Sequence, residues 1–258
     1  MIFYFTGTGN SLYVARNLGD GDVRSIPQEL AHADRSYAAN TIGIVSPVYY
    51  HELPRPVKEF IRTSTFSCDY FFIVGTYGNR HGGFAELTRR FLEECGKQAD
   101  YINTVIMVDN ALPGYDIAEQ LRIDPDKHVN EHIAAVKDDI AQRRAFIQPV
   151  TDADLAHHFA YVERGIIAPT DEDPLYAVTD ACVSCGTCED VCPTGCITLS
   201  DGHPTWDYAK CAICMACIHA CPATAIRFAT LPEKNPGVHY RNPHVSLADI
   251  VAANTPSR

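Results

Sequence analysis

The stretch CVSCGTCEDVCP, residues 182–193, is followed by a second stretch of the same pattern, CAICMACIHACP, residues 211–222. Both follow the spacing C-x2-C-x2-C-x3-C-P. The cysteines are Cys182, Cys185, Cys188 and Cys192 in the first copy, and Cys211, Cys214, Cys217 and Cys221 in the second. Three thiols at intervals of three residues can wrap around one small inorganic group. The fourth thiol lies four residues further on, before a proline, and points away toward a second group.

This run is the signature of bacterial-type iron–sulfur sites, in which the fourth cysteine ligates the cluster of the other run. It predicts two [4Fe-4S] clusters. The expected ligands are Cys182, Cys185, Cys188 and Cys221 for one cluster, and Cys211, Cys214, Cys217 and Cys192 for the other. A zinc ribbon needs only two C-x2-C pairs, so the remaining cysteines and both C-P steps would be surplus. A disulfide framework would need a secreted chain, and nothing in the sequence indicates export.

Residues 176–230 resemble the two-cluster bacterial ferredoxins in the cysteine run, the prolines and the compact separation of the copies. The resemblance implies a small α+β domain that carries electrons. The three other cysteines, Cys68, Cys95 and Cys196, are expected to be buried small side chains rather than ligands. Cys196 aligns with Ala225 of the second copy, which favours a packed residue over a ninth ligand.

Charge and hydropathy restrict the possible partners. The net charge of −11 argues against nucleic acid and against an anionic membrane surface. No apolar run approaches the ~18 residues of a membrane helix, so we expect no membrane insertion. The opening MIFYFTGTGN lacks the basic segment and apolar core of a signal peptide. These observations predict a cytoplasmic protein.

Acidity is densest in residues 151–175, which hold six acidic residues and one basic residue. An acidic face beside the clusters would select a redox protein partner with a basic docking face. A solvated linker explains the same charges without a partner.

The first 18 residues predict an anion-binding turn. Ile2–Phe5 reads as a strand and Asn10–Leu18 as a helix, and the turn between them is T-G-T-G-N-S. Backbone N–H groups and the helix dipole at such a turn favour a phosphate. Leu12 stands where a dinucleotide fingerprint would have its third glycine, and the lysine of a P-loop is absent.

Strands and helices are expected to alternate along the rest of this region. Apolar runs predict strands at 41–45, 70–76 and 101–108, and helical spacing predicts helices at 54–62, 84–95 and 129–146. Such alternation is typical of a doubly wound parallel sheet. Ligands of these sheets bind beyond the carboxyl ends of the strands. The site is therefore expected among the loops that follow the strands.

T-G-T-G-N-S resembles the phosphate loop of flavodoxins, and residues 1–148 resemble the flavodoxin-like fold along their whole length. The resemblance implies bound FMN. The implied phosphate contacts are Thr6, Gly7, Thr8, Gly9, Asn10 and Ser11, and the implied ring contacts are Ser46, Pro47, Val48, Tyr49, Tyr50, Thr76, Tyr77, Gly78 and Asn79. Taken singly, each tyrosine is equally well an ordinary core or surface aromatic. Residues 46–54 depart from the family in having no glycine, whose peptide often changes orientation on flavin reduction.

Four segments remain less defined. His51 and His81 on the ring loops are expected to be ordinary loop histidines, although either could supply protons to a reduced flavin. Residues 109–127 read as a loop near the flavin edge. Residues 149–175 read as an acidic linker with one or two helical turns at 156–162. The tail, 231–258, has a short helix candidate at 247–253 and either wraps the first domain or lies loose.

The order of domains resembles the flavodoxin–ferredoxin fusion proteins of anaerobes. It implies an electron-transfer protein that moves electrons between two [4Fe-4S] clusters and FMN and exchanges them with a redox protein. The alternatives are a flavin-dependent reductase that acts on a small substrate, and a redox sensor whose cofactors only report. A homodimer, in which the clusters of one chain approach the flavin of the other, is also compatible with the sequence.

Overall fold

A computed structural model describes residues 1–163 and 173–255. Within them, the first domain is built on a six-stranded parallel sheet. Its strand order is β2 (Val23–Ser25), β1 (Ile2–Tyr4), β4 (Thr41–Pro47), β6 (Tyr70–Tyr77), β7 (Tyr101–Ile106) and β8 (Phe146–Ile147). Without β8 and the separate pair of β3 (Ser36–Ala38) and β5 (Thr65–Ser67), this is the flavodoxin-like order 2-1-3-4-5. The predicted fold class is confirmed.

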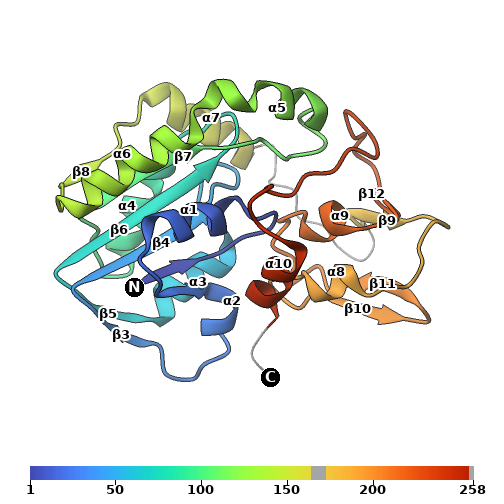
Figure 1. Cartoon of the computed structure of the whole chain (residues 1–258), viewed down its shortest axis with the longest axis horizontal. Helices are drawn as coiled ribbons and strands as arrows, with labels where there is room; N and C mark the ends of the chain where they lie inside the picture. Colours follow the sequence, from blue (N-terminus) through green and yellow to red (C-terminus); the bar gives the residue numbers. More distant parts are fainter. Residues whose placement is uncertain (164–172, 256–258) are drawn as a thin grey trace.

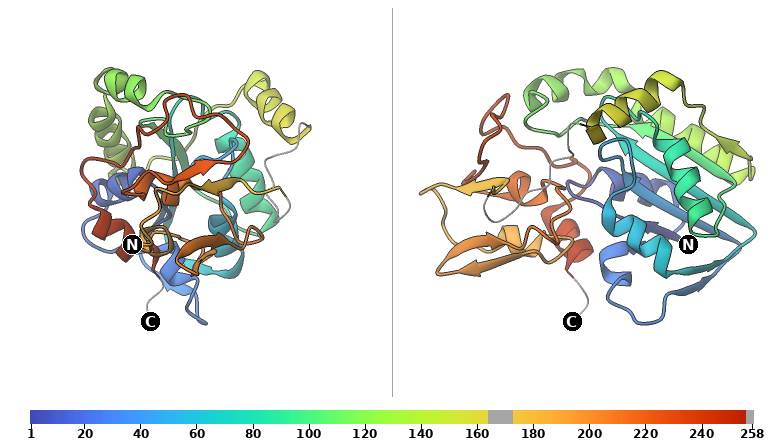
Figure 2. Two further views of the ribbon diagram at one scale, coloured as in Figure 1. Left: turned by 90° about the vertical axis from the view of Figure 1, so that its right-hand side faces the viewer. Right: turned by 180° about the vertical axis from the view of Figure 1, so that it is seen from behind.

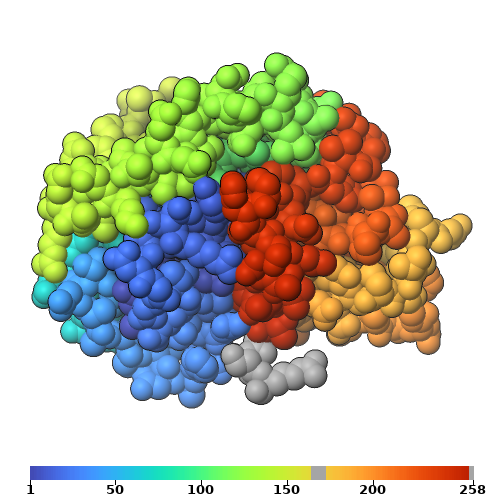
Figure 3. Space-filling model, viewed as in Figure 1, coloured from blue at the N-terminus to red at the C-terminus, as the bar shows by residue number. Residues whose placement is uncertain are grey.

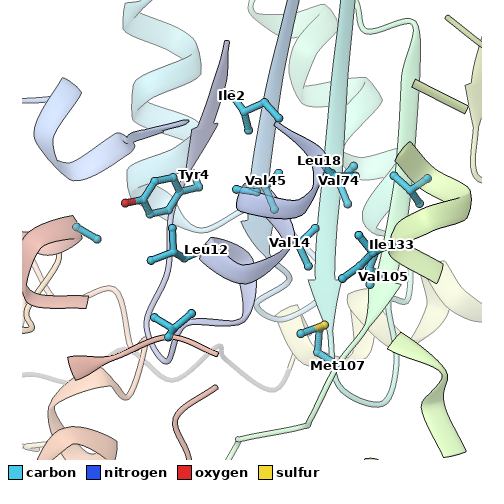
Figure 4. Close-up of a cluster of buried hydrophobic side chains, with 14 of the residues drawn as sticks. Ile2, Tyr4, Leu12, Val14, Leu18, Val45, Val74, Val105, Met107 and Ile133 are labelled. Atoms are coloured by element: carbon cyan, nitrogen blue, oxygen red, sulfur yellow. The ribbon is translucent and has the colours of Figure 1, made fainter. Parts of the chain in front are cut away.

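Helices cover both faces of this sheet (Figures 1 and 2). One face carries α1 (Asn10–Leu18) and α6 (Val129–Ala141), and the other carries α2 (Ile26–Glu29), α3 (Arg55–Thr63) and α4 (Phe84–Glu94). Figure 4 shows the core under α1, where Leu12 and Val14 meet Val45 and Val74 of the sheet. Burial of each such side chain contributes about 1.5–3 kcal/mol. This packing fixes where α1 begins, and therefore where the phosphate turn lies.

The second domain is small and has an internal repeat. Strand β9 (Tyr176–Val178) pairs antiparallel with β12 (Ile226–Phe228), and β10 (Ile197–Ser200) pairs antiparallel with β11 (His203–Trp206). The short helices α8 (Thr187–Asp190) and α9 (Ala216–Ala220) each begin inside one cysteine run. This arrangement is the α+β ferredoxin-like domain that the paired cysteine runs predict. Among the described residues, no helix has the length and apolarity needed to cross a bilayer.

Three predictions of local structure need correction. The helix expected at 129–146 ends at Ala141, because Arg143 turns into the left-handed region (φ 51°) and Phe146 pairs with Tyr101 as part of β8. The expected loop 109–127 contains α5 (Ile117–Ile123) and the 3-10 turn η1 (Asp124–Lys127). Asp116 starts α5 by accepting the N–H of Ala118 at 2.9 Å. The helical turns expected in the linker are longer, as α7 (Asp152–Glu163), while linker residues 164–172 lie outside the described part.

The tail wraps the first domain, a point that the sequence left open. Its helix α10 (Leu247–Asn254) lies between the two domains, as the space-filling view shows in red (Figure 3). Ile250 and Ala253 are buried in the core that contains α1. Asn254, 1% exposed, donates to the carbonyl of Thr6 at 3.2 Å and to that of Val191 at 2.9 Å. One amide therefore ties the phosphate turn to the first cysteine run.

Replacing Asn254 with alanine is expected to lower the free energy of unfolding by about 1–3 kcal/mol, because two buried carbonyls lose their donor. Anaerobic urea unfolding of the full chain measures this change. Asn17→Ala is the matched control, since the exposed Asn17 amide donates only to Tyr13 of its own helix at 2.8 Å and should matter by less than ~0.5 kcal/mol. Equal stability of the two variants would contradict the bridging role.

Candidate functional site

A cleft of about 250 Å³ opens beyond the carboxyl ends of β1, β4, β6 and β7. The loops that the sequence singled out meet there, because parallel strands end at one edge of the sheet. The predicted residues that line it are Thr6, Gly7, Thr8, Asn10, Ser11, Pro47, Val48, Tyr49, Tyr50, Thr76, Tyr77 and Gly78. The structure thus brings most of the predicted flavin contacts to one place.

Three predicted contacts do not line the cleft. The fully buried Ser46 donates its hydroxyl to the carbonyl of Pro47 at 2.9 Å. Asn79 points outward and donates to the Tyr115 hydroxyl at 2.8 Å. Gly9 has a φ of 100°, and a Cβ there would come within 2.9 Å of Val245 in the tail. Its role is to let the chain turn into α1 against that tail.

The phosphate end of the cleft is formed by hydroxyls and backbone N–H groups. Thr6 accepts the N–H of Gly9 at 3.0 Å, Thr8 accepts the Asn110 amide at 2.6 Å, and the Ser11 and Thr76 hydroxyls lie 2.8 Å apart. Helix α1 has no side-chain cap. Within the described ranges, no hydrogen bond to the N–H of Asn10 or Ser11 is formed. Free N–H groups at a helix start attract an anion, so this end fits a phosphate.

The side chain of Asn10, which lines the cleft, also makes three contacts within the protein. Its Oδ1 accepts the Tyr240 hydroxyl at 2.7 Å and the Asn242 amide at 3.1 Å, and its Nδ2 donates to the Val108 carbonyl at 3.3 Å. The Oδ1 of Asn10 is therefore taken by protein donors, while the second N–H of its Nδ2 and its backbone N–H can still donate to an anion. Sequence reasoning missed Tyr240 and Asn242, which come from the tail and carry no motif.

The ring end contains a strained turn. Tyr49 and Glu52 exchange both backbone hydrogen bonds, at 3.0 and 2.9 Å, and the two residues between them have φ of 51° (Tyr50) and 70° (His51). This is the geometry of a type I′ turn, which normally takes Asn-Gly. Left-handed backbone costs other residues about 1–2 kcal/mol each.

Packing holds this turn in place. A Cβ on Gly82 would lie 2.4 Å from the ring of His51, so the loop after β6 must have glycine there. From the other side, His158 of α7 forms a 3.0 Å hydrogen bond with the Tyr50 carbonyl. Strained backbone of this kind concentrates at functional sites. The turn places Tyr50 and His51 on the wall of the cleft.

Burial keeps this wall uncharged. It lowers the pKa of His51, with a further contribution from His158, and it raises the pKa of Tyr50 to about 12. Near neutral pH both side chains are therefore neutral. Lys127, which does not line the cleft, donates to the carbonyls of Gly78 (3.2 Å) and Met107 (2.6 Å). Its own pKa is lowered by burial. A flat, partly apolar ring fits such surroundings.

Other residues that line the cleft were not among the predicted contacts: His51, Arg80, Val108, Asp109, Asn110, Ala111, Tyr115, Tyr161, Ile213, Cys214 and Met215. Residues 109–111 begin the loop 109–127, which the sequence predicts near the flavin edge because it follows a strand, and Val108 directly precedes it. Tyr161 comes from α7, in the segment expected to be a linker. The last three come from the second cysteine run, and no motif in the sequence indicates which of its residues reach the cleft.

The eight cysteines of the double run lie around two small cavities. The outer cluster cavity is lined by Cys182, Cys185, Cys188 and Cys221, and the inner cluster cavity by Cys192, Cys211, Cys214 and Cys217. Each fourth cysteine has thus crossed to the other run, which is the arrangement expected from the signature. Backbone N–H groups of Cys196 and Ala225 donate to Cys192 at 3.4 Å and to Cys221 at 3.2 Å. Thiols with N–H donors around a cavity suit an iron–sulfur cluster.

The two cavities differ in exposure and position. Cys185 is exposed, whereas Cys214 lines both the inner cluster cavity and the cleft at the strand ends. Burial raises the pKa of Cys214 to about 12, so ligand binding there must displace a proton. A Cβ on Gly7 would lie 2.7 Å from the Cys214 carbonyl oxygen. The phosphate turn and the second cysteine run are therefore in direct contact.

Comparisons with known proteins support the iron–sulfur part. Residues 172–227 match the family model of the 4Fe-4S dicluster domain. The chain is 35% identical over 74 residues to NADH-quinone oxidoreductase subunit I of Pelobacter propionicus, a match that covers 24% of this chain and 40% of that protein. It is 40% identical over 48 residues to a ferredoxin-like protein in the nif region of Trichormus variabilis, covering 18% and 41%. The chain thus spans about two fifths of these relatives.

Two solved structures overlap 52% of the chain. Rubredoxin oxygen:oxidoreductase of Desulfovibrio gigas has a TM-score of 0.28, 13% identity and 35% of its own length covered. The Trp repressor binding protein of Bacillus subtilis has a TM-score of 0.31, 11% identity and 97% covered. At these scores the strand order, rather than the overlap, carries the fold assignment. The chain joins a flavodoxin-like parallel sheet to a ferredoxin-like 4Fe-4S domain, and such a domain serves electron transfer.

Proposed function

We propose that the chain is a flavin–iron–sulfur electron-transfer protein, which moves electrons between two [4Fe-4S] clusters and FMN and exchanges them with a redox protein. One observation carries the proposal. Cys214 and Met215 line the same cleft as the phosphate turn and Tyr50. A cysteine expected to hold a cluster therefore forms part of the wall of the expected flavin site.

One end of the cleft would bind the phosphate of FMN, and the other end would bind its ring. The N–H groups at the start of α1 and the hydroxyls of Thr6 and Thr8 would hold the phosphate. Tyr49, Tyr50 and Tyr77 would enclose the ring. FMN supplies two-electron chemistry and each cluster one-electron chemistry, so their combination converts between carriers of the two kinds.

The cysteine positions suggest the order in which electrons pass through the two clusters and the flavin. The outer cluster cavity reaches the surface at Cys185, beside the strongly exposed Val183 (66%). The inner cluster cavity shares Cys214 and Met215 with the cleft, whereas the outer one shares no lining residue with it. An external partner would meet the outer ligands first. The exposed carboxylates around them are Asp180, Glu189, Asp190 and Asp201, and they favour a partner with a basic docking face.

Anaerobic stopped-flow reduction of the loaded chain tests this function. Purified protein should hold one FMN and about eight iron and eight sulfide per chain. A basic, one-electron protein donor should reduce clusters and flavin in linked phases, more slowly at high salt as the charges are screened. Flavin and clusters that respond independently of each other would contradict the proposal. Iron well below eight per chain would contradict the two-cluster assignment.

A further inference from the structure

Two buried donors of the second domain lie at the inner cluster cavity. The hydroxyl of Tyr176 finds no acceptor within residues 1–163 and 173–255, and the indole N–H of Trp206 interacts with the thiol of Cys217, one of the expected ligands. Their rings lie 5.6 Å apart, and both side chains line the inner cluster cavity. Buried polar groups nearly always have hydrogen-bond partners, so the Tyr176 hydroxyl points to an acceptor that occupies the cavity, and the indole N–H is already directed at a ligand sulfur.

Sulfur is the acceptor that a bound cluster would bring. The phenol hydroxyl of Tyr176 can donate a hydrogen bond, and the indole N–H of Trp206 can only donate. Both side chains line the cavity together with Cys211, Cys214 and Cys217. Both groups are therefore placed to serve as hydrogen-bond donors to sulfur.

The internal repeat adds a second, independent difference between the two cavities. The Sγ of Cys192 lies 3.4 Å from that of Cys196 and 3.7 Å from the Thr194 hydroxyl. A Cys192 bound to iron would have no proton, and the Cys196 thiol and the Thr194 hydroxyl are placed to donate to it. The corresponding ligand of the other run, Cys221, has alanines at the two equivalent positions, Ala223 and Ala225.

The outer cluster cavity has fewer side-chain donors among the described residues. The Thr187 hydroxyl lies 3.3 Å from the Sγ of Cys185. Where the inner cavity has Tyr176 and Trp206, the outer one is lined by Leu199 and Pro204. The Ser184 hydroxyl donates elsewhere, to the carbonyl of Gly202. The inner cavity thus has four candidate donors against one.

We propose that Tyr176 and Trp206, together with Cys196 and Thr194, donate hydrogen bonds to the sulfurs of the inner cluster and make it the better electron acceptor of the two. This inference rests on the two-cluster assignment of the proposed function. Hydrogen bonds to cluster sulfurs raise the reduction potential, because the reduced form carries the extra negative charge. Burial of the inner cavity acts in the opposite direction, and the four donors outweigh it.

The difference in potential gives electron transfer between the two clusters a direction. One electron leaves the outer cluster and reduces the inner one, with no proton transferred, and the flavin cleft lies next to the inner cavity. Tyr176, Trp206, Cys196 and Thr194 are positioning residues in this step, since they act through the cluster rather than on a substrate.

Anaerobic potentiometry of the loaded full chain, followed by EPR, tests the inference. Tyr176→Phe, Trp206→Phe and Cys196→Ala should each lower the equilibrium constant for reduction of the inner cluster, by up to about tenfold for one hydrogen bond to a charged group. Tenfold corresponds to about 59 mV for a one-electron couple. The potential of the outer cluster should stay unchanged.

Two matched variants probe the outer cluster in the same way. Thr187→Val should lower only the outer potential. Ala225→Cys, which copies the inner arrangement, should raise only the outer potential. Tyr176→Phe removes a single oxygen atom, so it keeps the test decisive even if Trp206→Phe fails to fold.

The outcomes separate this inference from the proposed function. Fully loaded Tyr176→Phe and Cys196→Ala variants with unchanged potentials would overturn this inference but would not affect the proposed electron transfer between clusters and flavin. Wild-type protein short of iron would instead overturn the two-cluster assignment, and the inference with it. Lowered inner potentials with full iron content would support both.

Discussion

Replacing Thr8 with aspartate is expected to weaken FMN binding about a thousandfold. The Thr8 oxygen lies at the phosphate end of the cleft, where it accepts the Asn110 amide at 2.6 Å. A carboxylate there keeps that hydrogen bond but faces the phosphate. Two unit charges about 4 Å apart repel by about 4 kcal/mol at an effective dielectric constant near 20, and each 1.4 kcal/mol is about tenfold in Kd. Titration of FMN into the cluster-loaded, flavin-depleted chain measures the change.

The controls isolate the charge and its position. Thr8→Val removes only the hydroxyl and should weaken FMN binding by about tenfold or less, the value of one hydrogen bond. Ser67→Asp adds the same charge at an exposed site on β5 and should have no effect. Riboflavin, which has no phosphate, should bind wild type and Thr8→Asp alike. An unchanged FMN affinity in Thr8→Asp would place the phosphate elsewhere.

Replacing Cys214 with alanine is expected to halve the iron content and to stop reduction of the flavin through the clusters. Cys214 is one of the four expected ligands around the inner cavity, which Cys196 also lines, and it is the one ligand that also lines the cleft. Without it, the expected inner cluster has three protein ligands, while the outer cavity keeps its full set. Iron should fall from about eight to about four per chain. The outer cluster should still accept an electron from an external donor.

Two other cysteine variants serve as controls for Cys214→Ala. Cys68→Ala changes a half-buried cysteine outside the double run and should leave the iron content unchanged. Cys185→Ala removes an exposed ligand of the outer cavity and should remove the outer cluster instead. Stopped-flow spectra at flavin and cluster wavelengths follow both events. Normal flavin reduction in a Cys214→Ala protein with half its iron would show that electrons reach the flavin by another route.

Local patterns in the sequence were sufficient to predict those parts of the structure that are determined by residues close together in the chain. The cysteine spacing indicated both thiol sets, and the strand–turn–helix around Thr6–Ser11 indicated the phosphate end. The bounds of α1 were predicted to the residue, because Asn10–Leu18 has a clear apolar spacing. The shift at α6 arose because Phe146 is apolar enough to continue a helix but pairs with Tyr101 in the sheet.

The parts that the sequence did not indicate depend on contacts between distant segments. Asn10 is predicted as a phosphate contact from the turn alone, and only the structure shows that Tyr240 and Asn242 of the tail hold its side chain. The Tyr50–His51 turn lacks the Asn-Gly signal of its type, and its support comes from Gly82 and His158. Long-range packing of this kind leaves no periodic trace in the sequence, so only the structure shows it.

The contacts that the tail, including α10, makes with the phosphate turn also have a consequence for the order of folding during protein synthesis. Asn10 is synthesised early, but its hydrogen-bond partner Tyr240 lies 230 residues later in the chain. Asn254, which donates to the carbonyl of Thr6, lies 248 residues after Thr6. Contacts this distant in sequence close late in folding, since chain entropy opposes them until the intervening segments have collapsed. The parallel sheet can assemble while translation continues. The cleft at the strand ends, by contrast, reaches its final shape only after both cysteine runs have been made and positioned, because Cys214 and the tail complete it.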